Sequence, residues 1–234
     1  MNMTYARPTS SLLLVAALLT GCGPAPAPAP SNNNTNSAKP VPVADPSTYA
    51  PSPAEMEEAA SKRSAVIGKP AMDFRLQNQD EEYVQLSDLR GKWVILYFYP
   101  ADDTPGCTCQ ATEFTDILSQ INSLDAVVMG VSPDAPGMHR FFRAKYKIAL
   151  PLLSDVKGDV MRHYGAIVDS TIGGIKATRV VRSTYLIDPQ GTIAWHWPEV
   201  LPKGHASRVR DRLKSIQAAQ ATPDDAGQTK TGAQ

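Results

Sequence analysis

One apolar run constrains the fold of this chain more than any other feature. Residues 93–99 read Trp-Val-Ile-Leu-Tyr-Phe-Tyr, and Pro100 ends the run. A strand with one face in water alternates apolar and polar side chains, whereas a strand buried on both faces is apolar throughout. We therefore expect residues 93–99 to form a strand inside a sheet whose two faces are both covered by helices.

Helix and strand patterns alternate after this run. The turn signature Asp188-Pro-Gln-Gly191 predicts a hairpin between the last two strands. This order of elements predicts an α/β fold with a central mixed sheet. The expected helices cover residues 105–121, 138–147, 159–164 and 206–219, and the further strands cover residues 125–132, 150–153, 179–187 and 191–197.

The balance of charge and the cysteine count exclude several classes of protein. The chain has 23 Lys and Arg residues against 23 Asp and Glu residues. Nucleic-acid binding normally needs a basic excess or a basic stripe, so we expect no nucleic-acid partner. Three cysteines are too few for a disulfide-stapled scaffold, and no Cys/His cluster has zinc-finger spacing. No apolar run reaches the ~18 residues that a membrane-spanning helix needs.

The first 22 residues have the pattern of an export signal. Residues 1–21 combine one arginine, a short apolar core and Leu-Thr-Gly directly before Cys22. This pattern is typical of a secretory signal peptide, and its end resembles the lipobox of bacterial lipoproteins. Cys22 would then be the lipidated first residue of the mature protein. An ordinary signal peptide that is cut nearby, with Cys22 incidental, is the alternative.

The lipoprotein interpretation predicts an exported protein that acyl chains on Cys22 anchor to a bacterial membrane. The protein would face the periplasm or the cell exterior, and Gly23 after the cysteine points to the outer membrane in a Gram-negative host. Residues 22–63 are rich in Pro, Ala and Asn and predict a linker, and residues 221–234 predict a disordered tail. The folded domain is then expected at residues 64–220.

A cysteine follows the apolar run at the start of the next expected helix. If Thr104 caps this helix, Pro105 is its first residue and Cys107 its third. A thiol in the first turn lies near the positive end of the helix dipole and near unpaired backbone N–H groups. Both favour the nucleophilic thiolate. A buried structural cysteine is the alternative that these residues alone leave open.

The residues around Cys107 resemble the active-site motif of the peroxiredoxins. The run Pro100-x-x-x-Thr104-x-x-Cys107 is similar to the family motif, and Thr104-Pro-Gly-Cys-Thr108 resembles the bacterioferritin-comigratory, or PrxQ-type, branch. The similarity extends over residues 67–213. It implies a thioredoxin-like fold and a thiol-dependent peroxidase that reduces hydrogen peroxide and organic hydroperoxides.

The resemblance also implies roles for individual residues. Cys107 would attack the peroxide and become a sulfenic acid. Arg182 would stabilise the thiolate and bind the peroxide oxygens, with Arg179 as the competing candidate. Thr104 would offer its hydroxyl to the thiolate or the peroxide, although capping the helix would use the same oxygen. Pro100 would shield the sulfur from water.

The second cysteine of the domain departs from the pattern of the PrxQ branch. Many of these enzymes place a resolving cysteine five residues after the first, and that position is Thr112. Cys109 follows Cys107 by only two residues. In an intact helix two such side chains point about 200° apart, with Cys107 on the apolar face and Cys109 on the polar face. Cys109 could pair with Cys107 after local unwinding, or with another chain. An external thiol, such as a thioredoxin-like reductant, could instead resolve Cys107 and leave Cys109 a bystander.

Two other functions are open to an exported domain of this kind. A thioredoxin-like thiol-disulfide oxidoreductase would carry Cys-x-x-Cys, whereas this chain has Cys-Thr-Cys. A Cu(I)-binding carrier would use two soft thiolates, but it would also need Cys-x-x-x-Cys spacing and a loop histidine. The four histidines are scattered, so we expect structural or exposed roles for His139, His163, His196 and His205. The leading expectation is a peroxidase without metal or cofactor that works as a monomer or weak dimer.

Overall fold

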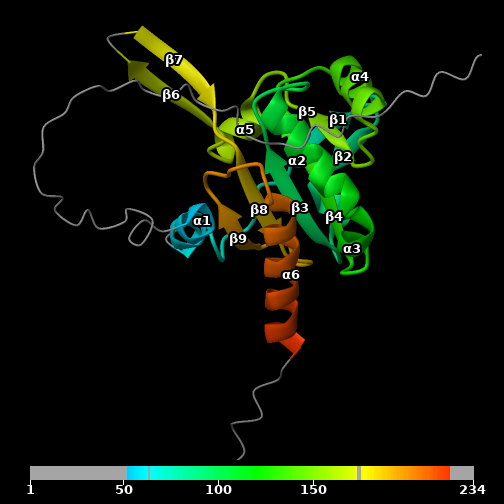
Figure 1. Cartoon of the computed structure of the whole chain (residues 1–234), viewed down its shortest axis with the longest axis vertical. Coiled ribbons are helices and arrows are strands. Elements are labelled where there is room, and N and C mark those ends of the chain that lie inside the picture. The colour runs from blue at the N-terminus through cyan, green and yellow to red at the C-terminus, as the bar shows by residue number, and fades with distance from the viewer. Residues whose placement is uncertain (1–51, 63, 173–174, 222–234) are drawn as a thin grey trace, which may run out of the picture. The chain divides into compact units, whose positions relative to one another are not determined.

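A seven-stranded mixed sheet forms the core of the computed structural model, which describes residues 52–62, 64–172 and 175–221 (Figure 1). Its strands are β1 (Arg75–Asn78), β2 (Tyr83–Gln85), β3 (Trp93–Phe98), β4 (Ala126–Ser132), β5 (Leu152–Ser154), β8 (Ser183–Ile187) and β9 (Ile193–Trp197). Their order across the sheet is β2-β1-β5-β4-β3-β8-β9. β4 pairs in parallel with β3 and β5, and the other pairs are antiparallel.

The apolar run predicted as a buried strand is β3. All six of its residues are buried. Trp93, Ile95 and Tyr97 belong to one hydrophobic cluster, and the alternate residues of the strand belong to a second cluster. Because successive side chains of a strand point to opposite faces, β3 contributes to both sides of the sheet at once. This arrangement is the reason for the absence of polar alternation in its sequence.

Helices cover both faces of the sheet, as predicted. One cluster takes side chains from α2 (Pro105–Asp116), α3 (Leu118–Asn122), α4 (Pro136–Tyr146) and α6 (His205–Ala221). The other takes side chains from the 3-10 helix η2 (Leu86–Leu89) and from α5 (Asp159–His163). The predicted α/β fold with a central mixed sheet is therefore confirmed. None of the helices in the described part of the chain is long and apolar enough to cross a membrane.

The region predicted as a linker up to residue 63 contains a helix, so the prediction is wrong for residues 53–62. This helix is α1 (Pro53–Lys62). A capping box begins it: the backbone N–H of Ser52 donates to the Glu55 carboxylate (2.6 Å), and the N–H of Glu55 donates to the Ser52 hydroxyl (3.3 Å). The predicted signal peptide, Cys22, most of the linker and the tail from residue 222 lie outside the described residues.

The single strand predicted for residues 179–187 is also wrong, because two strands occupy this region. β7 (Ile175–Val180) pairs with β6 (Ile167–Ile172) in a separate two-stranded sheet, whereas β8 belongs to the main sheet. Val181 and Arg182 connect them. Arg182 therefore precedes a buried central strand and does not lie within one.

Candidate active site

The first turn of α2 places Cys107 beside the end of β3. Thr104 has extended backbone angles at the N-cap position, and Pro105 is the first helical residue, as predicted. The first helical hydrogen bond runs from the N–H of Thr108 to the carbonyl of Thr104 (2.9 Å). Cys107 is 2% exposed and belongs to the hydrophobic cluster on this face of the sheet. The sulfur is therefore shielded from bulk water at the N-terminal end of a helix.

Arg182 is the charged partner of Cys107. Its Nη2 donates to the Cys107 Sγ over 3.1 Å, and its Nη1 donates to the Gln110 Oε1 over 2.7 Å. A hydrogen bond from a guanidinium stabilises a thiolate more than a neutral donor does. The competing candidate, Arg179, lies on β7, where an exposed ion pair of 3.8 Å joins it to Glu199. The structure brings Arg182, and not Arg179, to the cysteine.

Gly106 lies beside this contact. A Cβ atom at this position would lie 3.4 Å from the Cγ of Pro202 and 3.5 Å from the Nη2 of Arg182. These are ordinary van der Waals distances, so an alanine would fit, whereas a longer side chain would meet the guanidinium or the proline. The glycine of the Thr104-Pro-Gly-Cys motif therefore lies where the first turn of α2, Arg182 and Pro202 meet.

The Thr104 hydroxyl does not cap the helix. It donates to the carbonyl of Ala101 over 3.3 Å, and α2 has no side-chain capping bond. Among the hydrogen bonds of the described residues, none joins this hydroxyl to Cys107. Pro100 is half-buried just beyond β3. The catalytic roles of Thr104 and Pro100 stay predictions.

A buried network that sequence reasoning did not identify holds the loop between β3 and α2. The Asp102 carboxylate accepts hydrogen bonds from the Tyr99 hydroxyl (2.7 Å) and from the His139 Nδ1 (2.8 Å). The N–H of Asp102 donates to the Asp134 carboxylate (2.9 Å). Tyr99, Asp102 and His139 are all buried. The network joins the active-site loop to α4, and it confirms the structural role expected of His139.

Aromatic rings pack beneath Cys107. Tyr97 stacks on Phe114 and on Tyr99, with ring centroids 5.2 and 5.5 Å apart. Burial raises the pKa of Tyr97 far above its usual value, and the negative charge of Cys107 adds to this effect. Burial likewise raises the pKa of Tyr99. Both phenols therefore stay neutral, and they add no negative charge that would oppose a thiolate.

Cys109 is buried as well, with 8% exposure, so it does not face bulk water with the polar side of the helix. Its Sγ lies 3.8 Å from the Glu113 Oε1, which also accepts a hydrogen bond from the N–H of Gly204 (2.8 Å). Cys107 and Cys109 form no disulfide within the described part of the chain. The Thr112 hydroxyl, at the usual resolving position, donates to the backbone carbonyls of Thr108 and Cys109.

Metal ligands do not gather at the site. Within the described residues, no group of three or more His, Cys, Asp or Glu side chains is arranged to hold a metal ion. What the geometry does provide is a shielded sulfur beside a fixed guanidinium, an arrangement that suits nucleophilic chemistry.

Comparison with known proteins assigns this geometry to a family. The sequence profile of the AhpC/TSA family matches residues 67–196. The chain belongs to this family. It is 43% identical over 150 residues to the putative peroxiredoxin Bcp of Coxiella burnetii, across 64% of this chain and 99% of that protein. It is 37% identical over 150 residues to the peroxiredoxin Bcp of Bacillus subtilis, across 64% of this chain and 96% of that protein.

Solved structures agree with the fold. The bacterioferritin comigratory protein of Xanthomonas campestris, studied for alkyl peroxide reduction, superposes with a TM-score of 0.60 at 32% identity, covering 61% of this chain and 91% of that one. A cysteine variant of PrxQ from Xylella fastidiosa superposes with a TM-score of 0.61 at 33% identity, covering 64% and 96%. The predicted thioredoxin-like peroxiredoxin fold of the Bcp/PrxQ type is confirmed, and the chain is a thiol-dependent peroxidase.

Proposed function

We propose that Cys107 is the peroxidatic residue and that it reduces hydrogen peroxide and organic hydroperoxides. Its thiolate attacks the terminal peroxide oxygen, a sulfur–oxygen bond forms, and the O–O bond breaks. The departing oxygen takes up a proton and leaves as water or alcohol, and Cys107 becomes a sulfenic acid. The observation that carries the proposal is the 3.1 Å hydrogen bond from Arg182 to the Cys107 sulfur at the start of α2.

Arg182 supports both the reactant and the departing group. Its guanidinium already donates to the sulfur, and it is held in place by Gln110. As the O–O bond lengthens, negative charge develops on the departing oxygen, and a fixed cation stabilises that charge without rearrangement. Thr104 supplies its hydroxyl to the peroxide after giving up its bond to Ala101, and Pro100 keeps water from the sulfur.

A thiol reductant completes the cycle, and we favour an external thiol, such as that of a thioredoxin-like protein. The reductant's thiol attacks the sulfenic acid, water leaves, and a mixed disulfide forms that a second thiol reduces. Cys109 is a close second choice as the resolving residue. An intact first turn directs Cys107 and Cys109 apart, so a bridge between them requires local unwinding of α2.

Mass spectrometry of protein treated with peroxide separates these two routes. A loss of two hydrogen atoms from the peptide that contains both cysteines would support the Cys107–Cys109 bridge. A persistent sulfenic acid, or a mixed disulfide with an added thiol, would support external resolution.

The proposed assignment is tested by a peroxidase assay on Cys107→Ser and Cys109→Ser. We expect Cys107→Ser to abolish turnover and Cys109→Ser to slow recycling or change little, because only the first removes the nucleophile. The rate of the first turnover, followed by stopped flow, should fall only in Cys107→Ser. Full first-turnover activity in Cys107→Ser would refute the assignment.

We further propose that the protein is exported and held to a bacterial membrane by acyl chains on Cys22, and that it works as a monomer or weak dimer. The supporting observation is the signal-like sequence of residues 1–21 with Leu-Thr-Gly before the cysteine. In cells grown with labelled palmitate, the wild-type protein should carry label and sediment with membranes. Cys22→Ala should lose both properties, and an unlabelled wild-type protein would contradict the proposal.

A further inference from the structure

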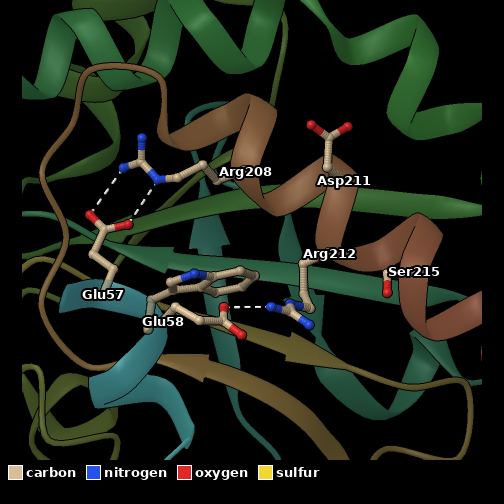
Figure 2. Close-up of a pocket in the computed structure, with 7 residues that line it drawn as sticks. Glu57, Glu58, Arg208, Asp211, Arg212 and Ser215 are labelled. Atoms are coloured by element: carbon tan, nitrogen blue, oxygen red, sulfur yellow. Dashed lines mark hydrogen bonds and ion pairs between the residues drawn. The ribbon is translucent and has the colours of Figure 1, made fainter. Parts of the chain in front are cut away.

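A buried carboxylate on α1 lies outside the segment that the family profile matches. Glu57 is 6% exposed. The Arg208 side chain of α6 binds it through two hydrogen bonds, from Nε to Oε2 (2.8 Å) and from Nη2 to Oε1 (3.0 Å). Figure 2 shows this pair, and beside it the second pair between Glu58 and Arg212. A buried carboxylate that lost its partner would be strongly destabilising.

These polar pairs join α1 to α6. A cavity of about 350 Å³ lies between the two helices, and charged side chains provide most of its lining (Figure 2). Most of the described side chains of α1 are exposed or half-buried. α1 is therefore held both by these ion pairs and by its contact with β9.

The Glu57–Arg208 pair also holds the loop between β9 and α6, residues 198–204. The N–H of Leu201 donates to the Glu57 Oε1 (2.9 Å). Arg208 donates to the carbonyls of Leu201 and Lys203, over 3.1 Å in each case. Glu57 thus accepts hydrogen bonds from both the loop and the arginine that clamps it. Glu58 instead pairs with Arg212, one turn further along α6.

The β9–α6 loop in turn borders the active site. The N–H of Val200 donates to the backbone carbonyl of Arg182 (2.9 Å). Pro202 lies beside Gly106, in the first turn of α2. Arg182 stands in the short connection between β7 and β8, and the bond from Val200 is one of its backbone restraints, beside the bond from Val181 to Ala166 and the pairing of Ser183 with Phe98. A displaced loop would remove the restraint on the Arg182 carbonyl and loosen the residue whose guanidinium reaches Cys107.

We propose that Glu57 is a positioning residue for the peroxidase reaction, which fixes the β9–α6 loop and through it holds the Arg182 guanidinium at Cys107. The inference rests on the proposed role of Arg182. It assigns a part in the reaction to a helix that precedes the family segment. Glu57 itself touches neither the sulfur nor the peroxide.

Glu57→Gln is the central variant, and Glu58→Gln is its matched control. Both changes remove one negative charge from α1 and one ion pair with α6. We expect Glu57→Gln to slow the oxidation of Cys107 by hydrogen peroxide about tenfold and to shift the pH profile of Cys107 alkylation toward higher pH. Glu58→Gln should leave both within about twofold. Circular dichroism would verify that both proteins are folded.

A double variant distinguishes positioning through Arg182 from a general loss of stability. If Glu57 acts through Arg182, adding Glu57→Gln to Arg182→Lys should slow the reaction little further. Additive losses, an unchanged rate in Glu57→Gln, or equal losses in Glu57→Gln and Glu58→Gln would each overturn the inference. If Glu57→Gln unfolds, Arg208→Lys replaces it, because lysine keeps the charge but cannot make the same set of bonds.

The same measurements separate this inference from the proposed function. If Arg182→Lys alone leaves Cys107 oxidation unchanged, the proposed role of Arg182 fails, and the inference fails with it. If Arg182→Lys slows oxidation and Glu57→Gln does not, only the inference about Glu57 is wrong.

Discussion

Among single residues, Arg182 makes the contact on which the proposed mechanism depends most directly. Its two terminal nitrogens divide between the Cys107 sulfur and the Gln110 carbonyl oxygen. The planar guanidinium can make both hydrogen bonds at once. The ammonium of a lysine is a compact charge on a shorter side chain. Gln110 is fully buried, so it positions the guanidinium without competition from water.

We expect Arg182→Lys to slow the oxidation of Cys107 by about tenfold or more, because the sulfur loses a fixed charged donor. Stopped-flow measurement of the first turnover gives this rate directly. Arg179→Lys is the control, since Arg179 is exposed on β7 and pairs with Glu199 at 3.8 Å. Equal rates in the two variants would contradict the assignment of Arg182.

The motif predicted Cys107 as the nucleophile and Arg182, in preference to Arg179, as its partner, and the structure places the Arg182 guanidinium at the Cys107 sulfur. It could not predict the bonds of Asp102, because His139 lies 37 residues away and no local pattern links the two. It also misjudged the surroundings of Cys109. Helical spacing predicts that Cys109 lies on the polar face of α2. The β9–α6 loop covers this face, and the N–H of Gly204 in the loop donates a hydrogen bond to Glu113.

At the scale of secondary-structure elements, the pairing of β3 and β4 leaves no space around Tyr97. Gly130 lies opposite Tyr97 in the parallel ladder. A Cβ at Gly130 would lie 2.6 Å from the Tyr97 hydroxyl and 3.0 Å from the Leu152 Cδ2. Tyr97 is fully buried against Phe114, so it cannot simply move aside. The glycine therefore sets the distance between β4 and the aromatic layer beneath the cysteine.

We expect Gly130→Ala to lower the free energy of unfolding by about 1–3 kcal/mol, because the added methyl group overpacks the core. Urea denaturation measures this change. Gly137→Ala on α4 is the control: nothing lies within 4 Å of its added Cβ. This variant should be neutral or more stable by up to about 1 kcal/mol. A Gly130→Ala protein as stable as the control would show that Tyr97 repacks freely.

The elements that periodicity predicted are those with an apolar signal of their own. β3 and α2 carry continuous or helically spaced apolar residues, and both begin where expected. α1 has no such apolar stripe, and charge pairs with α6 help to hold it. The Ser52–Glu55 capping box nevertheless indicated in the sequence that a helix could begin there. The sequence pattern did not predict the break between β7 and β8 at Val181 and Arg182, because both residue types also occur within strands.

For the molecule as a whole, two buried histidines make stability depend on pH. Burial lowers the pKa of His196 to about 4, and burial also lowers the pKa of His205 well below its usual value. His196 stacks on Tyr185 at 4.1 Å, and its Nδ1 pairs with the Ser64 hydroxyl at 2.7 Å. Neutral imidazole is therefore the form that the folded state accepts.

The folded state should lose stability as the pH falls from about 6.5 to about 4. In this range His196 binds a proton in the unfolded chain but stays neutral in the folded protein. A change of pKa from 6.5 to about 4 corresponds to about 3 kcal/mol from this residue. Urea denaturation at several pH values measures the decline. His196→Phe should decline less steeply than His163→Phe, whose position on α5 is exposed. Identical slopes would contradict this account.

The place of α1 beside β9 has a consequence for how the chain tolerates shortening. β9 is the last strand on its side of the sheet, and α1 contacts it. Beyond a few bonds from residues 68 and 69 to Ile193, the outer edge of β9 has no strand partner in the described sheet. An uncovered strand edge is a template for pairing with other molecules. A protein trimmed to begin at residue 67 would therefore be more prone to aggregate during refolding.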